Sequence, residues 1–167
     1  YTMPTSPLVL LGGKIITYLV ICLLQFYIIL FVGKYMFPTI GLASFDFEGK
    51  LIGLTLVTLF AGLAAVSLGV LFGTLFKTQE QSSPFGATFV VILAAISGIW
   101  VPTFAMPQAM QYVAKASPMN WALEGYYTIL LRDGGLWQMR YDIILLLLFS
   151  LLILTIALFY DKKKRYL

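Results

Sequence analysis

Long apolar runs with almost no charge constrain this chain more than any other feature of its sequence. A helix needs about 20 apolar residues to cross a hydrocarbon core of roughly 30 Å. Four stretches reach or approach that length, at about 15–32, 51–76, 85–101 and 143–159. Because backbone polar groups find no water in a bilayer, such runs fold as helices. The sequence therefore predicts an all-α, polytopic transmembrane helix bundle.

The composition agrees with a membrane protein and excludes several kinds of site. Hydrophobic residues make up 60% of the 167 residues and charged residues 11%, whereas soluble domains average roughly 45–50% and about 25%. The chain has no histidine, and its one cysteine, Cys22, lies inside an apolar run. These counts exclude a disulfide framework, the usual zinc sites and a Cys/His nucleophile pair.

Nothing in the sequence forms a catalytic or nucleotide-binding constellation. Gly12, Gly13 and Lys14 resemble the end of a phosphate-binding loop, but Leu8 and Ile15 occupy the positions that require Gly and Ser or Thr. The polar residues within the apolar runs are uncharged, which argues against a proton relay or a voltage sensor. We therefore expect no enzyme activity, cofactor or metal in this chain.

The charged residues predict the orientation. One side of a four-span topology holds Lys14, Lys77 and the run 162–165 with Glu80 and Asp161, six basic against two acidic residues. The other side holds five of each sign. Because cytoplasmic flanks carry the excess of Lys and Arg, we expect both ends, including the basic tail 161–167, to face the cytoplasm. We expect the protein to lie in the plasma (inner) membrane. The chain begins with Tyr1, and we expect further sequence upstream.

The connection between the third and fourth runs is too apolar for an ordinary exterior loop. Ser117 and Pro118 predict the start of a short helix that ends near Leu131, and the run 133–135 (Asp-Gly-Gly) predicts its stop. This helix is too short to span. Two placements stay open: a re-entrant exterior helical hairpin over 102–131, or an amphipathic helix on the membrane surface.

A few residues within this framework are candidates for function. For the hairpin or gate they are Pro102, Pro107, Pro118, Trp121 and Glu124; for helix packing, Ala65, Gly69 and Gly73. The three small residues share one helix face, which suits close packing or a smooth wall along a transport route. Gln25 is the most costly side chain to expose to lipid, so we expect it to face the bundle or a transport pathway. Glu124 and Arg132 share a helix face but do not touch directly unless the helix is distorted.

The order of several motifs resembles that of the membrane subunit of ABC exporters of the second type. These motifs are MPTSPLVLLGGK (3–14), GLAAVSLGVLFGTLFKTQEQSS (62–83), SGIWVPTFAMP (97–107) and ASPMNWALEGYY (116–127). The Ser-Pro-x-x-Trp pattern that follows a Pro-x-x-x-x-Pro hairpin is the most specific of them. The resemblance implies a six-span subunit, of which this chain holds the last four spans.

The resemblance also implies partners and roles for particular segments. Residues 1–13 match the end of a cytoplasmic coupling segment that meets a separate ATPase, with Pro4, Thr5, Ser6 and Pro7 at the contact. ATP and magnesium would be bound by that ATPase subunit. The family's exterior re-entrant hairpin corresponds to 102–131. The resemblance further implies a homodimer, or a heterodimer with a second permease, in the lipid bilayer, with no nucleic acid partner.

Two functional hypotheses from different classes follow. The first is a permease subunit that moves an amphipathic or lipid-like substrate, of the drug, lipid or glycan class, out of the cell. The movement would occur by alternating access and would be driven by ATP hydrolysis on the partner ATPase. The second is a non-transport scaffold or assembly protein that docks a partner through the apolar exterior hairpin. A passive channel is disfavoured because no span carries a regular polar stripe.

Overall fold

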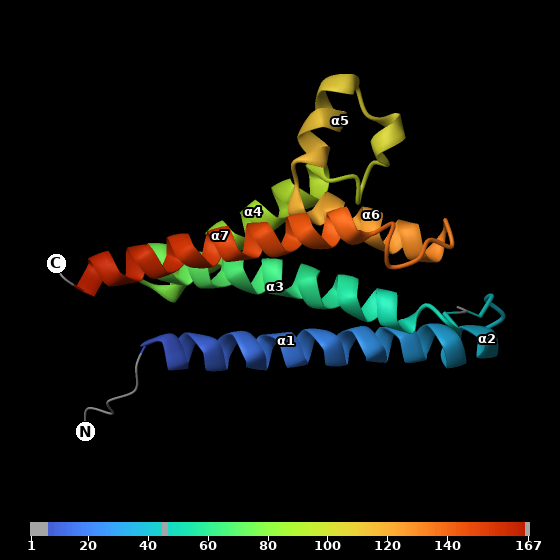
Figure 1. Ribbon diagram of the computed structural model, residues 1–167, viewed down its shortest axis with the longest axis horizontal. Coiled ribbons are helices and arrows are strands. Elements are labelled where there is room, and N and C mark those ends of the chain that lie inside the picture. Colours follow the sequence, from blue (N-terminus) through green and yellow to red (C-terminus); the bar gives the residue numbers. More distant parts are fainter. Residues whose placement is uncertain (1–6, 45–46, 166–167) are drawn as a thin grey trace.

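The computed structural model describes residues 7–44 and 47–165, and all regular elements in these ranges are helical. The first half contains α1 (Pro7–Phe31), the π-helix η1 (Val32–Met36), α2 (Phe37–Thr39) and α3 (Leu51–Leu75). The second half contains α4 (Gln79–Ile96), the 3-10 helix η2 (Thr103–Ala105), α5 (Gln108–Lys115), α6 (Pro118–Leu130) and α7 (Arg140–Arg165). The predicted all-α helix bundle is confirmed (Figure 1).

The helix α3 is the centre of the bundle. It runs lengthwise between α1 and α7 and also contacts α4 and α6 (Figure 1). Its buried residues occur along most of its length, from Gly53 to Phe72. The start of α1 and the end of α7 lie at the same end of the bundle (Figure 1). Every other long helix therefore uses α3 as its packing surface.

The first helix is longer than predicted at both ends. The apolar run predicted a span over about 15–32, but α1 begins at Pro7 and passes through Gly12 and Gly13 without interruption. At the other end the helix continues through η1 into α2. Pro38 cannot donate a backbone hydrogen bond, and the preceding Phe37 N–H donates five residues back to the Val32 carbonyl. The helical segment ends at Thr39, and the turn that follows contains Gly41, whose φ of +80° suits glycine.

The third apolar run forms a helix that differs from its predicted bounds of 85–101. Pro84, expected in the first turn, lies inside α4, which starts at Gln79 and ends at Ile96. Gly98 has a φ of +99°, so the chain leaves the helix direction there. Among the described residues three helical segments are long and apolar enough to cross a membrane, namely Leu11–Thr39, Leu51–Leu75 and Arg140–Lys162. The helix α4 is not one of them.

The last helix extends beyond the predicted run 143–159 in both directions. It starts at Arg140 and continues through the basic segment to Arg165, where a tail separate from the span was expected. Lysine and arginine are good helix formers, and positive charge near a helix C-terminus interacts favourably with the helix dipole. The basic segment therefore prolongs the helix.

The region 102–131 contains a helical hairpin made of α5 and α6. The helix α5 projects sideways from the bundle, whereas α6 lies lengthwise against α3 and α7 (Figure 1). The side chains of Pro118, Asn120 and Ile129 on α6 are buried. On the projecting part, Phe104 and Tyr112 are 86% and 74% exposed. The hairpin thus has one arm that belongs to the bundle and one that stands outside it.

Two glycines permit α3 and α6 to approach closely. A Cβ atom at Gly125 would lie 3.0 Å from a methyl group of Val57, and one at Gly53 would lie 3.0 Å from the end of Ile129. Val57 and Ile129 belong to a buried cluster with Leu54 and Met139. In a membrane, where lipid is as apolar as the side chains, this close van der Waals packing is what holds helices together.

Replacement of Gly125 by leucine is expected to lower the thermal midpoint of the purified protein. The added side chain must displace α6 from Val57, and overpacking of this kind costs about 1–3 kcal/mol. Gly13→Leu is the matched control, because Gly13 is also inside a helix but a Cβ there would meet no described atom within 4 Å. Equal midpoints for the two variants in detergent would contradict the close α3–α6 contact.

Candidate functional site

A groove of about 690 Å³ lies between α1 and α3. We call it the α1–α3 groove. Its polar lining residues are Lys14, Tyr18, Cys22, Gln25, Thr74 and Asp161. The α1 members Lys14, Tyr18 and Gln25 recur at helical spacing, so they form one face of that helix. Gln25, predicted to face the bundle or a pathway, lies on the wall of this groove.

The small residues of α3 line the groove. Ala65, Gly69 and Gly73 all border it and are exposed. A Cβ atom at Gly69 or Gly73 would meet no described atom within 4 Å. Within the described part of this chain, the three residues form an open wall of the groove. A role for them in packing against another helix stays a prediction. Close approach of α1 and α3 occurs instead at Gly62, where a Cβ atom would lie 3.0 Å from the Cys22 sulfur.

A second cavity, of about 380 Å³, lies on the other side of the small residues of α3. We call it the apolar cavity. It is bordered by α3, α4, α6 and α7, and its larger lining side chains are Leu68, Phe72, Val90, Leu93, Met119 and Leu146. Ala65 and Gly69 line both cavities. The two spaces therefore meet along one stripe of α3.

Hydrogen bonds between side chains join α3 to α1 and to α6. The Thr58 hydroxyl donates to the Leu54 carbonyl oxygen at 2.7 Å, so it accepts the bond from the Tyr126 hydroxyl at 2.8 Å. By the same reasoning Tyr27 donates to Thr55 at 2.7 Å, since Thr55 donates within its own helix. Sequence analysis missed these pairs. Each pair joins segments far apart in the chain, so the spacing of residues does not reveal it. The available signal was the presence of threonine and tyrosine within apolar runs.

The predicted gate residues begin or anchor the elements of the hairpin. Pro102 and Pro107 directly precede η2 and α5, and Pro118 is the first residue of α6. The Trp121 indole N–H donates to the Lys115 carbonyl oxygen at 2.7 Å. Its ring lies edge-on to Phe149 with the centroids 6.2 Å apart. Trp121 thus ties the end of α5 to α6 and packs the hairpin against α7.

A buried hydrogen bond closes the loop between α4 and α6. The Asn120 side-chain amide donates to the Ser97 carbonyl oxygen at 2.7 Å, and both residues are buried. This bond satisfies a carbonyl group at the end of α4 and holds the start of α6 beside it. The adjacent Ser117, predicted as the cap of α6, occupies that position without a side-chain capping bond. The Asn120 side chain therefore ties the start of α6 to the end of α4.

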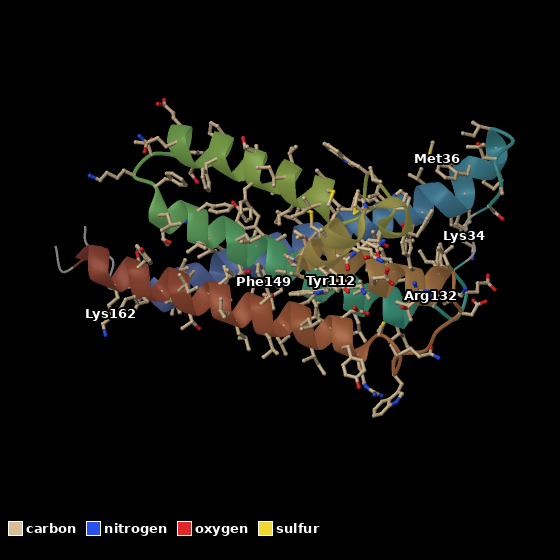
Figure 2. All side chains as sticks on the ribbon, turned by 90° about the horizontal axis from the view of Figure 1, so that it is seen from above. Lys34, Met36, Tyr112, Arg132, Phe149 and Lys162 are labelled. Carbon is tan, nitrogen blue, oxygen red and sulfur yellow. The ribbon has the colours of Figure 1, made fainter. Side chains whose placement is uncertain are left out.

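Glu124 and Arg132 form an ion pair, a contact that was expected only if the helix is distorted. The Arg132 guanidinium lies 2.9 Å from the Glu124 carboxylate. The helix α6 ends before Arg132, and Asp133 adopts a left-handed φ of +49°, so the arginine is not held at helical spacing. Ion pairs also join Lys50 to Asp133 and Lys34 to Glu48. Lys34 and Arg132 lie at the end of the bundle opposite Lys162 (Figure 2).

The predicted ATPase-coupling residues lie at the edge of the described structure. Pro4, Thr5 and Ser6 are outside the described residues, and Pro7 is the first residue of α1. The end of the predicted coupling segment 1–13 is therefore continuous with the helix that lines the α1–α3 groove. In the described ranges no three His, Cys, Asp or Glu residues lie close enough together to hold a metal ion.

Long apolar helices packed around α3 define a multi-pass helical membrane protein. A family model described as ABC-2 family transporter protein matches residues 1–159, and the chain belongs to this family. Family membership implies a transmembrane, non-catalytic part of a transporter. The chain is similar to the linearmycin resistance permease protein LnrN of Bacillus subtilis (strain 168), with 29% identity over 119 residues. The match covers 71% of this chain but 29% of that relative. No solved structure matches the chain.

Accessibility of introduced cysteines is expected to distinguish the groove wall from the core. In a Cys22→Ser background, Gln25→Cys and Gly73→Cys are expected to react with a small water-soluble thiol reagent, because the reactive thiolate forms only where water enters. Val57→Cys is the control and stays unmodified, since Val57 is fully buried. Lack of reaction at both groove positions in the native membrane would contradict a water-filled groove.

Proposed function

We propose that this chain is part of the permease of an ABC exporter and moves an amphipathic or lipid-like substrate outward. ATP hydrolysis on a separate ATPase subunit would drive this movement. The observation that carries the proposal is the α1–α3 groove, which combines a polar face of α1 with the open small-residue wall of α3. A relative named as a resistance permease supports a cargo of the drug class.

The position of the groove supports an inward-facing entry for the cargo. Lys14 and Asp161 border it near the end of the bundle where α1 starts and α7 finishes. The excess of basic residues at that end favours a cytoplasmic location in the plasma (inner) membrane, with the C-terminus inside. In this orientation the groove opens toward the cytoplasm, as export requires.

The unbroken helix α1 supplies a physical link between the partner ATPase and the groove. It starts at Pro7, the last of the proposed contact residues, and continues past Lys14 and Tyr18. A helix without a break transmits a displacement of its end along its length. Nucleotide-dependent movement of the ATPase would thereby alter the separation of α1 from α3. Two permease subunits, identical or different, would complete the translocation path.

Purification of the complete protein in mild detergent tests the proposal. We expect a stoichiometric partner that carries a phosphate-binding loop, and ATP hydrolysis that is coupled to substrate movement in vesicles.

Replacement of Pro4 and Pro7 by alanine is expected to leave hydrolysis and membrane insertion intact while transport falls, since the contact with the ATPase is altered. Unchanged transport would contradict the coupling role, and absence of any ATPase partner would favour a scaffold instead.

Labelling of single cysteines from the two sides of the membrane tests the orientation. A cysteine introduced by Gly135→Cys, between α6 and α7, where a Cβ atom would meet no described atom within 4 Å, is expected to react with an impermeant reagent in intact cells. One introduced by Lys163→Cys is expected to react only after permeabilisation, because the basic end of α7 is cytoplasmic in the proposed topology. The reverse pattern would overturn the orientation and with it the outward direction of transport.

A further inference from the structure

We propose that Arg140, together with Trp137 and Tyr141, binds the phosphate group of an anionic phospholipid at the start of α7. The acyl chains of this lipid lie against the exposed apolar face of α7 that follows. The inference concerns the membrane around the protein and not its cargo, so it does not depend on the α1–α3 groove. Its starting observation is that the Arg140 guanidinium carbon lies 4.1 Å from the Trp137 ring centroid and 4.6 Å from that of Tyr141.

The two rings hold the guanidinium group in place and leave most of its donors available. A cation over an aromatic ring is attracted by the negative charge of the ring face, and this contact uses no N–H group. A guanidinium carries five N–H donors. One of those of Arg140 donates to the Tyr141 hydroxyl at 3.0 Å. The remaining donors suit an acceptor with several oxygens, and arginine binds phosphate in this way through two parallel hydrogen bonds.

The charge of Arg140 has no carboxylate partner in the described part of the chain. The ion pairs of the described residues involve Lys34, Lys50 and Arg132 as the bases. Asp142, two residues after Arg140, interacts electrostatically with the charged side chains beside α6. An anionic lipid supplies the missing opposite charge, whereas the cationic group of a zwitterionic lipid would meet a like charge. This difference favours an anionic head group.

The length of α7 places Arg140 at the depth of the lipid phosphates. The span Arg140–Lys162 has 23 residues, and a helix of that length covers about 34 Å. The hydrocarbon core is about 30 Å thick, so the two ends of the span reach opposite head-group regions. Tryptophan and tyrosine are enriched at this depth in membrane proteins. Trp137 and Tyr141 are 77% and 64% exposed, so their rings face lipid there.

The backbone that carries the site is fixed by contacts on the other side. Met139 is fully buried, in the cluster with Leu54 and Val57 of α3. The turn before it is closed by the Gly135 N–H, which donates to the Gln138 side-chain oxygen at 2.6 Å, and by the Gln138 N–H, which donates to the Gly135 carbonyl oxygen at 3.0 Å. The arginine and the two rings are therefore positioned before a lipid arrives, which lowers the entropic cost of binding.

The face of α7 next to the site suits acyl chains. Ile144, Leu148 and Leu152 recur at intervals of four residues, so they share one helix face, and all three are exposed. Tyr141 lies one turn before Ile144 on the same side of the helix. One lipid molecule can therefore contact Arg140 with its phosphate and this leucine-rich face with its hydrocarbon.

Photolabelling of the complete protein in phosphatidylcholine nanodiscs tests the inference. The probe is phosphatidylglycerol with a photoactivatable group close to the glycerol end of one acyl chain. We expect the label on the first turns of α7, from Tyr141 to Leu148, and competition by unlabelled phosphatidylglycerol. A phosphatidylcholine probe with the same chains is expected to label this segment less, because its head group has no net negative charge.

Substitutions within the site sharpen the test. Arg140→Gln is expected to lower labelling about tenfold, as loss of a charge-assisted hydrogen bond typically does. Trp137→Leu is expected to lower it as well, because the guanidinium group loses one of the rings that position it. Arg132→Gln is the matched control. It removes the same charge at the same end of the bundle, but Arg132 is paired with Glu124, so labelling is expected to persist.

Several results would overturn the inference. Equal labelling by the phosphatidylcholine probe, label confined to other segments, or unchanged labelling of a folded Arg140→Gln variant would each contradict it. Disulfide cross-linking of Trp137→Cys to another protein segment would show that protein and not lipid covers the site. Competition in the unmodified protein gives a readout even where a variant fails to fold. Since ATPase binding and transport are measured separately, none of these results decides the proposed function.

Discussion

A hydrocarbon core offers no hydrogen-bonding partner to a backbone amide, and the rest of this structure depends on that constraint. The long apolar runs satisfy their amides within helices, so the fold reduces to how helices pack. Packing in turn requires close van der Waals contact, since lipid competes equally for apolar side chains. The helix α3 meets this requirement on more than one face, with Gly53 against α6 and Gly62 against α1. This explains its central position.

The same constraint explains how the bundle accommodates the break after α4. The apolar part of α4 is short, and the chain leaves it at Gly98 and returns at Pro118. A break of this kind exposes carbonyl groups, which are tolerated only where the protein itself provides partners. Asn120 provides one by donating to the Ser97 carbonyl oxygen. Trp121 provides another at Lys115. The projecting arm of the hairpin, α5, is thus held at its base by two side chains of α6.

Sequence reasoning found the helices but not their contacts, and the reason is physical. The apolar runs and the Ser117–Pro118 start of α6 follow from local chemistry, and the structure agrees. Helix ends were less predictable, because Gly12 and Gly13 are tolerated in a helix that lipid or neighbours stabilise. The Glu124–Arg132 ion pair forms because Arg132 lies beyond the end of α6, where helical spacing no longer fixes the distance between the two side chains. The groove could not be predicted, because the small-residue face of α3 is equally suited to a helix partner and to open space.

The contacts between α1 and α3 are distributed unevenly, and this asymmetry connects the fold with transport. Toward the far end, the Tyr27 hydroxyl bonds to Thr55, and one further turn or so along, Cys22 meets Gly62. The groove runs beside α1 from Lys14 to Gln25, so it extends to either side of that contact. In the proposed function, a force applied at Pro7 would act on a helix that is held to α3 by the Cys22–Gly62 contact and the Tyr27–Thr55 hydrogen bond, and that borders the groove between Lys14 and Gln25. Because α1 continues through Gly12 and Gly13 without a break, the helix is stiff along its length, which the proposed coupling requires.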